Sequence, residues 1–353
     1  MIFERNKDSR LSPDFTLMDT ITHTVLGACV GEALAGKKLG KKAMLIGAIA
    51  NNFPDVDVVT SLWMYQADSL LAHRGFTHSI LFVLIMTGLS GWLMKKLFPK
   101  IKFSYREWTL LIGINLFLHI IIDSFTAYGT GWFEPFSHYR VSFNILFVAD
   151  PFYTIALLIS AIGLLILKRT SVRRKAWANA GLIISSCYFM YALFHKIEIN
   201  HIVKESLAKE NISFQDVTTT PTPLNNFLWY IIAANDTGFH IGYYSVFDHS
   251  KEIPFHYVPK NDFLLDSLRR DHRVKKLVRF SEGLYCMEKR KDTLIFNDLR
   301  FGQIGGWQSG SAPFVFQYRL QQTSDYNVAI QKGRIQASGG KALRLMIERI
   351  KGN

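Results

Sequence analysis

Residues 79–98 read SILFVLIMTGLSGWLMKKLF, an apolar run whose only charged residues are two lysines near its end. A helix of about 20 apolar residues is long enough to cross the hydrocarbon core of a bilayer. Three further runs, residues 108–125, 152–167 and 177–194, have the same character. We therefore predict four membrane-spanning helices in the first half of the chain.

Two earlier apolar segments, residues 21–35 and 43–53, are shorter and rich in Gly and Ala. They could be short spans, re-entrant elements or helices buried by their neighbours. The sequence thus predicts a multi-pass α-helical membrane domain of four to six apolar helices, which occupies residues 1–198.

The remainder, residues 199–353, has shorter apolar runs that alternate with polar residues. Such alternation is typical of β-strands, and the Asn-Asp-Thr-Gly segment within residues 227–247 indicates a hairpin. Further strands are predicted at residues 274–280, 293–296 and 314–320, with an amphipathic helix at 340–350. We expect a β-rich soluble, extramembrane domain, to which the sequence assigns no role.

The formal charge of +13 could indicate nucleic acid, an anionic surface or the cytoplasmic loops of a membrane protein. Three basic clusters lie between apolar runs, at residues 37–42, 95–106 and 168–175. Lys and Arg in short loops are retained in the cytoplasm. This pattern predicts external loops at residues 51–78 and 124–151 and an external C-terminal domain, with no nucleic-acid partner.

The external loops and adjoining helix ends carry a set of His and Asp residues. Asp55 and Asp57 are two residues apart in a turn segment, and His119 and Asp123 share one helix face. The other members of the set are His23, His73 and His78. Imidazole and carboxylate together suit a divalent ion, with zinc the first choice and manganese the second. A lone His such as His23 could instead simply pack between helices.

Several neighbouring residues have two interpretations. Arg74 could hold a substrate oxyanion, or it could pair with Asp55 or Asp57. Thr77 and Ser79 could support the histidine ligands, or they could cap the helix that follows. Asp150, directly before Pro151, is expected to cap a helix, the alternative being a ligand or catalytic role.

At His23, residues 54–57, the block HRGFTHS at residues 73–79, and His119 with Asp123, the sequence resembles the membrane-bound, metal-dependent hydrolase family typified by YdjM. The resemblance covers roughly residues 18–195, and the HRGFTHS block is its most specific part. It implies a bacterial inner (plasma) membrane protein in which these His and Asp residues bind the metal. Its hydrolase activity is suggested by a similarity to zinc-dependent phospholipase C enzymes.

We therefore expect a membrane-bound hydrolase that uses metal-activated water on a phosphoester or lipid-like substrate at the membrane surface. Asp57 is the candidate general base as well as a candidate ligand, and Arg74 steadies the oxyanion. The alternative is a non-enzymatic metal-binding scaffold or an ion carrier. A carrier needs ionisable residues staggered through the membrane, whereas these residues gather at one face. Membrane lipids are the expected partners.

Overall fold

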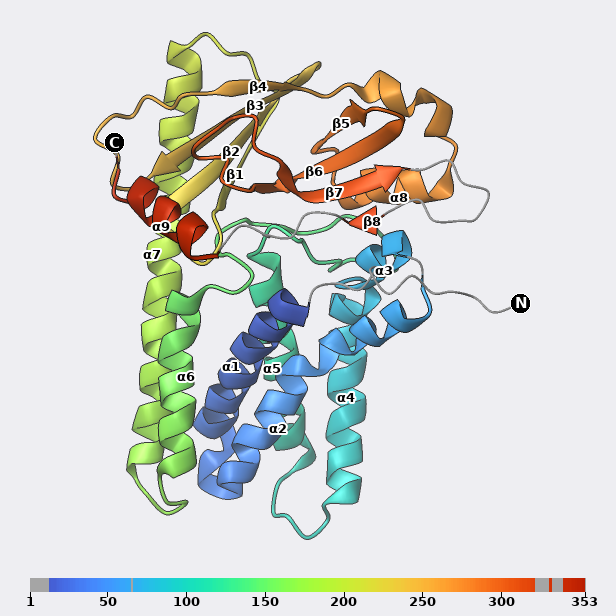
Figure 1. The fold of residues 1–353 in the computed structure, drawn as a ribbon. Helices are drawn as coiled ribbons and strands as arrows, with labels where there is room; N and C mark the ends of the chain where they lie inside the picture. Colours follow the sequence, from blue (N-terminus) through green and yellow to red (C-terminus); the bar gives the residue numbers. More distant parts are fainter. Residues whose placement is uncertain (1–12, 65, 321–329, 332–338, 353) are drawn as a thin grey trace. The chain divides into compact units, whose positions relative to one another are not determined.

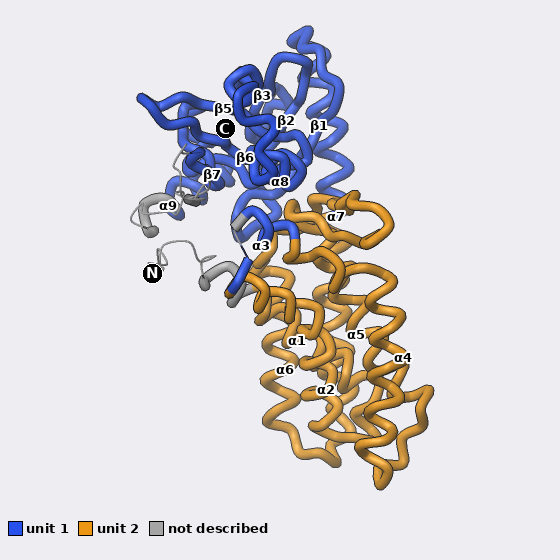
Figure 2. Tube along the Cα trace, turned by 90° about the vertical axis from the view of Figure 1, so that its right-hand side faces the viewer, with its two compact units in different colours: residues 1–11, 63–71, 193–353 blue, residues 12–62, 72–192 orange. Residues whose placement is uncertain are grey.

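The computed structural model describes residues 13–64, 66–320, 330–331 and 339–352, which divide into two compact units (Figure 2). The described residues of the helical unit lie within 12–62 and 72–192, and those of the sheet unit lie within 63–71 and 193–353. One long helix, α7 (Arg173–Lys209), belongs to both units.

The helical unit contains a helix at each apolar segment of the sequence (Figure 1). Its elements are α1 (Pro13–Leu39), α2 (Lys41–Asn52), η2 (Phe53–Leu62), η3 (Phe76–His78), α4 (Ile80–Leu97), α5 (Tyr105–Ser124), α6 (Pro151–Ile166) and the first part of α7. Among the described residues, α4, α5 and α7 are long and apolar enough to cross a membrane, and α6 is apolar but shorter. The first helix is longer than its apolar segment because it continues over polar residues at both ends.

Local signals set the starts of the apolar helices. Ser79 caps α4 by accepting a hydrogen bond from the backbone N–H of Phe82. Ser104 and Glu107 form a reciprocal capping box at the start of α5. Asp150 caps α6, with Pro151 in its first turn, so the capping interpretation of Asp150 holds.

Helices α1 and α2 pack closely because glycines face each other. A Cβ atom on Gly47 would lie 2.1 Å from the backbone oxygen of Gly27, and one on Gly27 would lie 2.4 Å from that of Gly47. No larger residue fits at this approach without moving a backbone. The contact brings the start of α1 beside the end of α2, and both ends contribute to the site described below.

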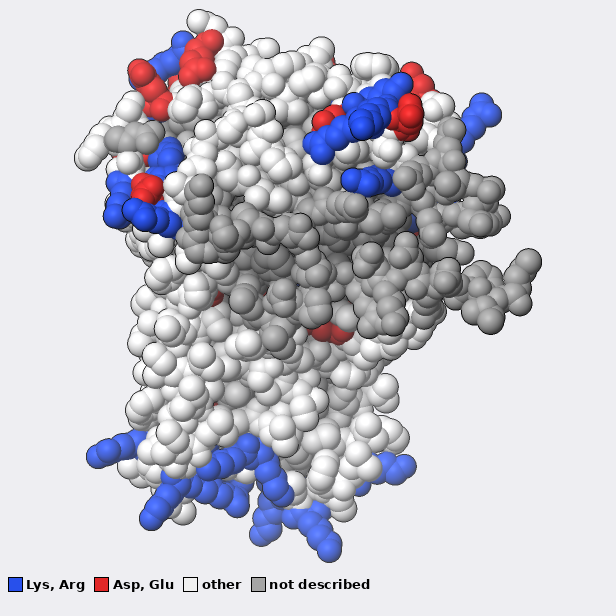
Figure 3. Space-filling model, in the orientation of Figure 1, with Lys and Arg blue, Asp and Glu red and all other residues white. Residues whose placement is uncertain are grey.

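The helix connections at one end of the helical unit are basic (Figure 3). The α1–α2, α4–α5 and α6–α7 connections all lie at this end, as Figure 1 shows. Arg174, in the first turn of α7 at this end, is buried and forms a two-pronged ion pair with Glu32 of α1. The segments η2 and η3 and the end of α5 lie at the opposite end of the unit.

The sheet unit contains two four-stranded antiparallel sheets, each in sequence order. The first sheet consists of β1 (Asp216–Pro221), β2 (Leu228–Ala234), β3 (Gly238–Ser245) and β4 (His256–Pro259), and the second of β5 (Tyr285–Arg290), β6 (Thr293–Gln303), β7 (Phe314–Leu320) and β8 (Ile330–Gln331). The predicted hairpin is β2 and β3. The unit also contains α3 (Gln66–Ala72), η4 (Asp262–Leu268) and α9 (Gly339–Ile350).

The core of the first sheet forms against the end of α7. Ile199, Val203 and Leu207 of the helix pack with Trp229 and Ile231 of β2. Burial of these large apolar side chains is the main source of stability for such a layer. A β-containing C-terminal region is therefore present, as the sequence indicated.

One predicted strand is wrong. Residues 274–280 form the helix α8 (His272–Phe280). Its buried residues, Val274, Leu277 and Phe280, recur every third position, which places them on one helix face. The carboxylate of Asp271 accepts a hydrogen bond from the N–H of Arg273 and caps the helix. Apolar and basic residues also alternate loosely over residues 274–280, which is why the sequence alone favours a strand there.

Candidate metal centre

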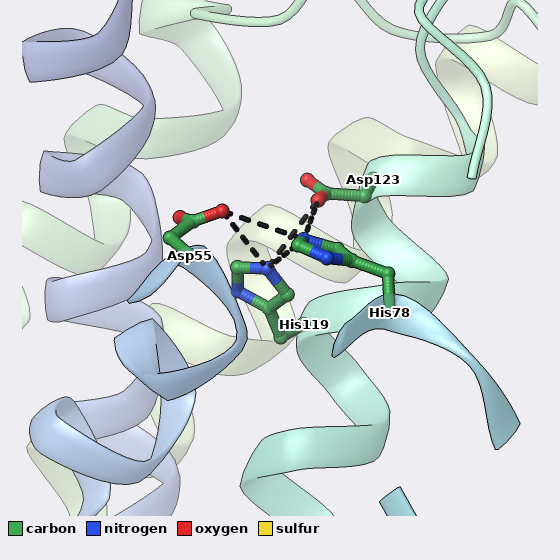
Figure 4. Close-up of side chains that lie close together, drawn as sticks. All are labelled: Asp55, His78, His119 and Asp123. Atoms are coloured by element: carbon green, nitrogen blue, oxygen red, sulfur yellow. Dashed lines mark hydrogen bonds and ion pairs between the residues drawn. The ribbon is translucent and has the colours of Figure 1, made fainter. Parts of the chain in front are cut away.

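Four side chains from three elements converge at the end of the helical unit opposite the basic connections (Figure 4). Asp55 comes from η2, His78 from η3, and His119 and Asp123 from one face of α5. Nε2 of His78 lies 3.4 Å from Oδ1 of Asp55 and 3.2 Å from Oδ2 of Asp123. Nε2 of His119 lies 3.5 Å and 3.3 Å from the same two oxygens. We call these four residues the central group.

When both imidazoles are neutral, as metal binding requires, the central group contains more hydrogen-bond acceptors than its own protons can satisfy. The hydroxyl of Thr77 donates its proton to Oδ2 of Asp57. Towards Nδ1 of His78, 3.0 Å away, the hydroxyl oxygen can therefore act only as an acceptor. In its neutral form, which is the form that binds metal, His78 therefore carries its proton on Nδ1 and presents the lone pair of Nε2 to Nε2 of His119 at 3.0 Å. A single proton on His119 could serve one of its three acceptor neighbours, which leaves the others without a donor.

Two carboxylate oxygens of the central group are left over. Oδ1 of Asp55 and Oδ2 of Asp123 are buried and accept no hydrogen bond from any described residue. Buried acceptors without a donor are costly, and a cation between them removes the cost. Four ligands at zinc-bonding distance in a tetrahedron lie about 3.3–3.4 Å apart. The five separations of 3.0–3.5 Å match that spacing, so the residues fit a divalent ion.

Asp57 lies behind His78, and both of its oxygens are already engaged. Oδ1 is 2.9 Å from Nδ1 of His73, and Oδ2 accepts hydrogen bonds from the Arg74 backbone and the Thr77 hydroxyl. Nδ1 of His78 is 3.3 Å from Oδ2. A carboxylate in this position fixes the orientation of a histidine ligand. Of the two roles predicted for these residues, Thr77 therefore has the supporting one, through its contact with His78. Ser79 has the other role and caps α4.

The second oxygen of Asp123 is held from the other side. Oδ1 lies 3.1 Å from Nε2 of His23 and 3.2 Å from Nη2 of Arg74. The same guanidinium nitrogen lies 2.6 Å from Oδ2 of Asp19. Asn51 donates to the Asn115 carbonyl and so turns its own oxygen towards Nδ1 of His23. These contacts hold Oδ1 and leave Oδ2 directed at the central group.

Three groups of described residues are close enough to hold a metal ion, and they share members. The first is the central group. The second is Asp19, His23 and Asp123, and the third is Asp55, Asp57 and His73. All seven sequence-predicted ligands thus lie in one of these groups.

Two residues that contribute to the site, Asp19 and Asn51, were not predicted from the sequence. Asp19 precedes His23 by four residues on α1, so the i, i+4 spacing that identified His119 and Asp123 could have identified it as well. Asn51 carries no such signal, because its role depends on the packing of α1 against α2. Arg74 pairs with Asp19 and Asp123 through its side chain, and only its backbone contacts Asp57.

Electrostatics keeps the carboxylates ionised at neutral pH. Burial opposes ionisation of Asp57, but hydrogen bonds from His73 and His78 outweigh it and hold its pKa well below the usual range. The pKa of Asp55 is likewise lowered, against burial, by the charge of His119 and by the closeness of both central histidines. Burial lowers the pKa of His78, but the nearby carboxylates of Asp123, Asp55 and Asp57 have the larger effect and raise it to well above 6.5. The ionised carboxylates of the site therefore favour a positive charge beside them, whether that of a protonated histidine or of a metal ion.

These features define a helical protein with apolar spans and a buried imidazole–carboxylate cluster at one end of its helices. The chain belongs to the YdjM inner membrane protein family, whose model matches residues 18–199. It is 26% identical over 324 residues to the uncharacterized protein YfhP of Bacillus subtilis, covering 84% of this chain and 90% of the relative. It is 30% identical over 122 residues to the inner membrane protein YbcI of Escherichia coli, covering 34% of this chain and 69% of the relative. No solved structure matches the chain.

Family membership agrees with the resemblance seen in the sequence. The matched residues 18–199 include all members of the three groups. Together with the apolar helices, membership supports a location in the bacterial inner membrane.

Proposed function

We propose that the chain is a membrane-bound, metal-dependent hydrolase whose ion is held by the central group. The proposal rests on the three buried acceptor atoms around Nε2 of His119, which are Nε2 of His78, Oδ1 of Asp55 and Oδ2 of Asp123. The two carboxylate oxygens accept no hydrogen bond from any described residue. Two imidazoles and two carboxylates suit zinc, with manganese as the second choice. A divalent ion held there supplies a Lewis acid that polarises a phosphoryl or acyl group and activates water.

The surrounding residues have separate tasks in this proposal. Asp57 orients His78, since its oxygens are occupied by donors and are not free to serve as a general base. His23 orients Asp123. The side chain of His73 is 12% exposed, whereas those of His23, His78 and His119 are fully buried. His73 is therefore the histidine placed to give a proton to a substrate or take one from it.

The surface near the centre supports a lipid or lipid-linked phosphoester as substrate. Val56 of η2 and Phe76 of η3 are exposed, although their neighbours Asp57 and Thr77 point into the cluster. Phe133 and Phe136, in the loop after α5, are exposed as well. Exposed apolar side chains at the ends of membrane helices suit the headgroup region. We place this end outside the cytoplasm, because the basic connections lie at the other end.

We also propose that the chain is multi-pass, with residues 1–198 as the membrane domain and residues 199–353 as an external, β-rich domain. Helices α4, α5 and α7 would span fully, and α1, α2 and α6 would complete the bundle. A reporter fused to the C-terminus tests this topology. Activity of a periplasmic reporter is expected, and activity of a cytoplasmic reporter contradicts the placement.

The enzymatic proposal is tested by metal analysis of the detergent-purified protein together with a screen of phosphodiester and phospholipid substrates. Wild type should contain metal and hydrolyse at least one substrate, and His119→Ala should lose both. His201→Ala is the control, because the His201 side chain is 73% exposed on α7 and lies outside the three groups. Metal retained by His119→Ala would refute the site. Metal without hydrolysis would favour the non-enzymatic scaffold.

A further inference from the structure

The second group of potential ligands already contains a cation. Asp19 and Asp123 belong to that group with His23. Nη2 of Arg74 lies 2.6 Å from Oδ2 of Asp19 and 3.2 Å from Oδ1 of Asp123. The guanidinium therefore bridges the two carboxylates that a second metal ion would need.

Arg74 is held firmly in this position. Nη1 donates to the Thr126 hydroxyl at 2.7 Å and lies 3.4 Å from the Asp123 carbonyl. Its guanidinium carbon is 5.3 Å from the centre of the Tyr128 ring, a cation–π contact. The backbone has φ 58, in the left-handed region that a residue with a Cβ avoids. The surrounding structure thus stabilises an unfavourable backbone to place this side chain.

The same contacts argue against a substrate-binding role for Arg74. The residue is 1% exposed, and both terminal nitrogens are engaged with groups of the protein. Its remaining nitrogen, Nε, is buried. An oxyanion would have to displace Asp19 to reach Nη2, and an arginine that already neutralises a buried carboxylate gains little from that exchange.

We propose that the Arg74 guanidinium takes the place of a metal ion at the second group. Both Asp57 oxygens of the third group are already engaged, so the centre then holds one divalent ion per chain. The inference rests on the proposed metal site at the central group. A divalent ion on Oδ1 of Asp123 would lie close to the fixed positive charge of Arg74, and repulsion between such charges is strong in a buried site. Arg74 thereby also leaves Oδ2 of Asp123 as the oxygen directed at the central group.

Removal of the guanidinium should open the second position. Nε2 of His23 would remain 3.1 Å from Oδ1 of Asp123 and 3.5 Å from Oδ1 of Asp19, which are spacings that suit ligands of one ion. Asn51 would continue to hold the other His23 nitrogen. Three ligand atoms would then face a site without a competing cation.

The test is the number of zinc ions per chain, measured by mass spectrometry and elemental analysis after zinc loading and gel filtration in detergent. We expect one ion in wild type, one in Arg74→Lys, which keeps the charge, and two in Arg74→Met. The double variant Arg74→Met with Asp19→Asn should return to one. Arg140→Met is the matched control, because Arg140 is also buried, donates hydrogen bonds to the backbone carbonyls of His73 and Gly129, and lies outside the three groups; this variant should hold one ion.

The outcomes separate the two proposals. Two ions in wild type, or one ion in Arg74→Met, would overturn the role of Arg74 and leave the central metal site standing. No ion in wild type would overturn the proposed function and, with it, this inference. If Arg74→Met elutes as an aggregate, Arg74→Gln replaces it, with the same expected count of two and the same refuting count of one.

Discussion

Replacement of Asp57 by Asn separates an orienting role from a ligand role. Asp57 accepts hydrogen bonds from His73, the Arg74 backbone and Thr77, and Thr77 in turn accepts from Nδ1 of His78. An Asn of the same shape keeps one acceptor oxygen but turns an NH₂ group towards donors. The orientation of His78 is then weakened, while all four atoms of the central group remain.

The expected effect is a loss of affinity without a loss of the site. Removal of a group that orients a histidine ligand weakens metal binding by about 10–100-fold. This corresponds to about 1.4–2.8 kcal/mol, since each 1.4 kcal/mol is a factor of ten. At saturating zinc, Asp57→Asn should still bind as many ions as wild type.

The assay is a competition titration of the detergent-solubilised protein against a coloured zinc chelator at constant pH. Asp150→Asn serves as control, because Asp150 is a buried carboxylate that caps α6 and Asn caps a helix equally well. Its zinc affinity should equal that of wild type. Complete loss of zinc from Asp57→Asn would show that Asp57 is a ligand, and unchanged affinity would show that it does not orient His78; either result refutes the reasoning.

Three further predictions concern pH, helix packing and the sheet unit. The pKa of His78 is raised well above 6.5, so zinc must displace a proton from this histidine. The zinc affinity should therefore fall by about tenfold for each unit by which the pH is lowered from 8 to 6, and a flat profile over this interval would contradict the prediction. Gly47→Val should push α1 away from α2, lower the midpoint of thermal unfolding and weaken zinc binding. Gly88→Val on α4, where an added Cβ atom would meet only the Tyr105 hydroxyl at 3.8 Å, should bind zinc normally. Leu277→Ala should destabilise the sheet unit by about 2–5 kcal/mol in denaturant unfolding, and a change below 1 kcal/mol would count against a buried helix face at α8.

The helical half of the chain was predictable because its signals are local. A long apolar run specifies a helix almost without context, and Ser79 and Asp150 mark helix starts by their own side chains. The strand predicted at residues 274–280 was wrong because the local signal there is weak. In a short segment an apolar residue at every third position resembles an irregular alternation, and the Asp271 cap was the better guide.

The candidate site was predictable as a list of residues, but their separate roles were not. His119 and Asp123 share a helix face whatever the rest of the chain does. By contrast, one oxygen of Asp123 contacts Arg74 and the other faces the central group. This arrangement depends on contacts between residues 49 positions apart in the sequence. The contact of Asn51 with His23 depends on the packing of α1 against α2, for which the glycines of these helices were the only sign in the sequence. Long-range geometry decides which carboxylate oxygen is free.

The central claim is that Asp55, His78, His119 and Asp123 hold one divalent ion. The most direct test is an anomalous-difference map at the zinc edge from crystals of the zinc-loaded protein. We expect one strong peak per chain, enclosed by Nε2 of His78, Nε2 of His119, Oδ1 of Asp55 and Oδ2 of Asp123. A map without a peak there, or with its strongest peak bound by other residues, would contradict it.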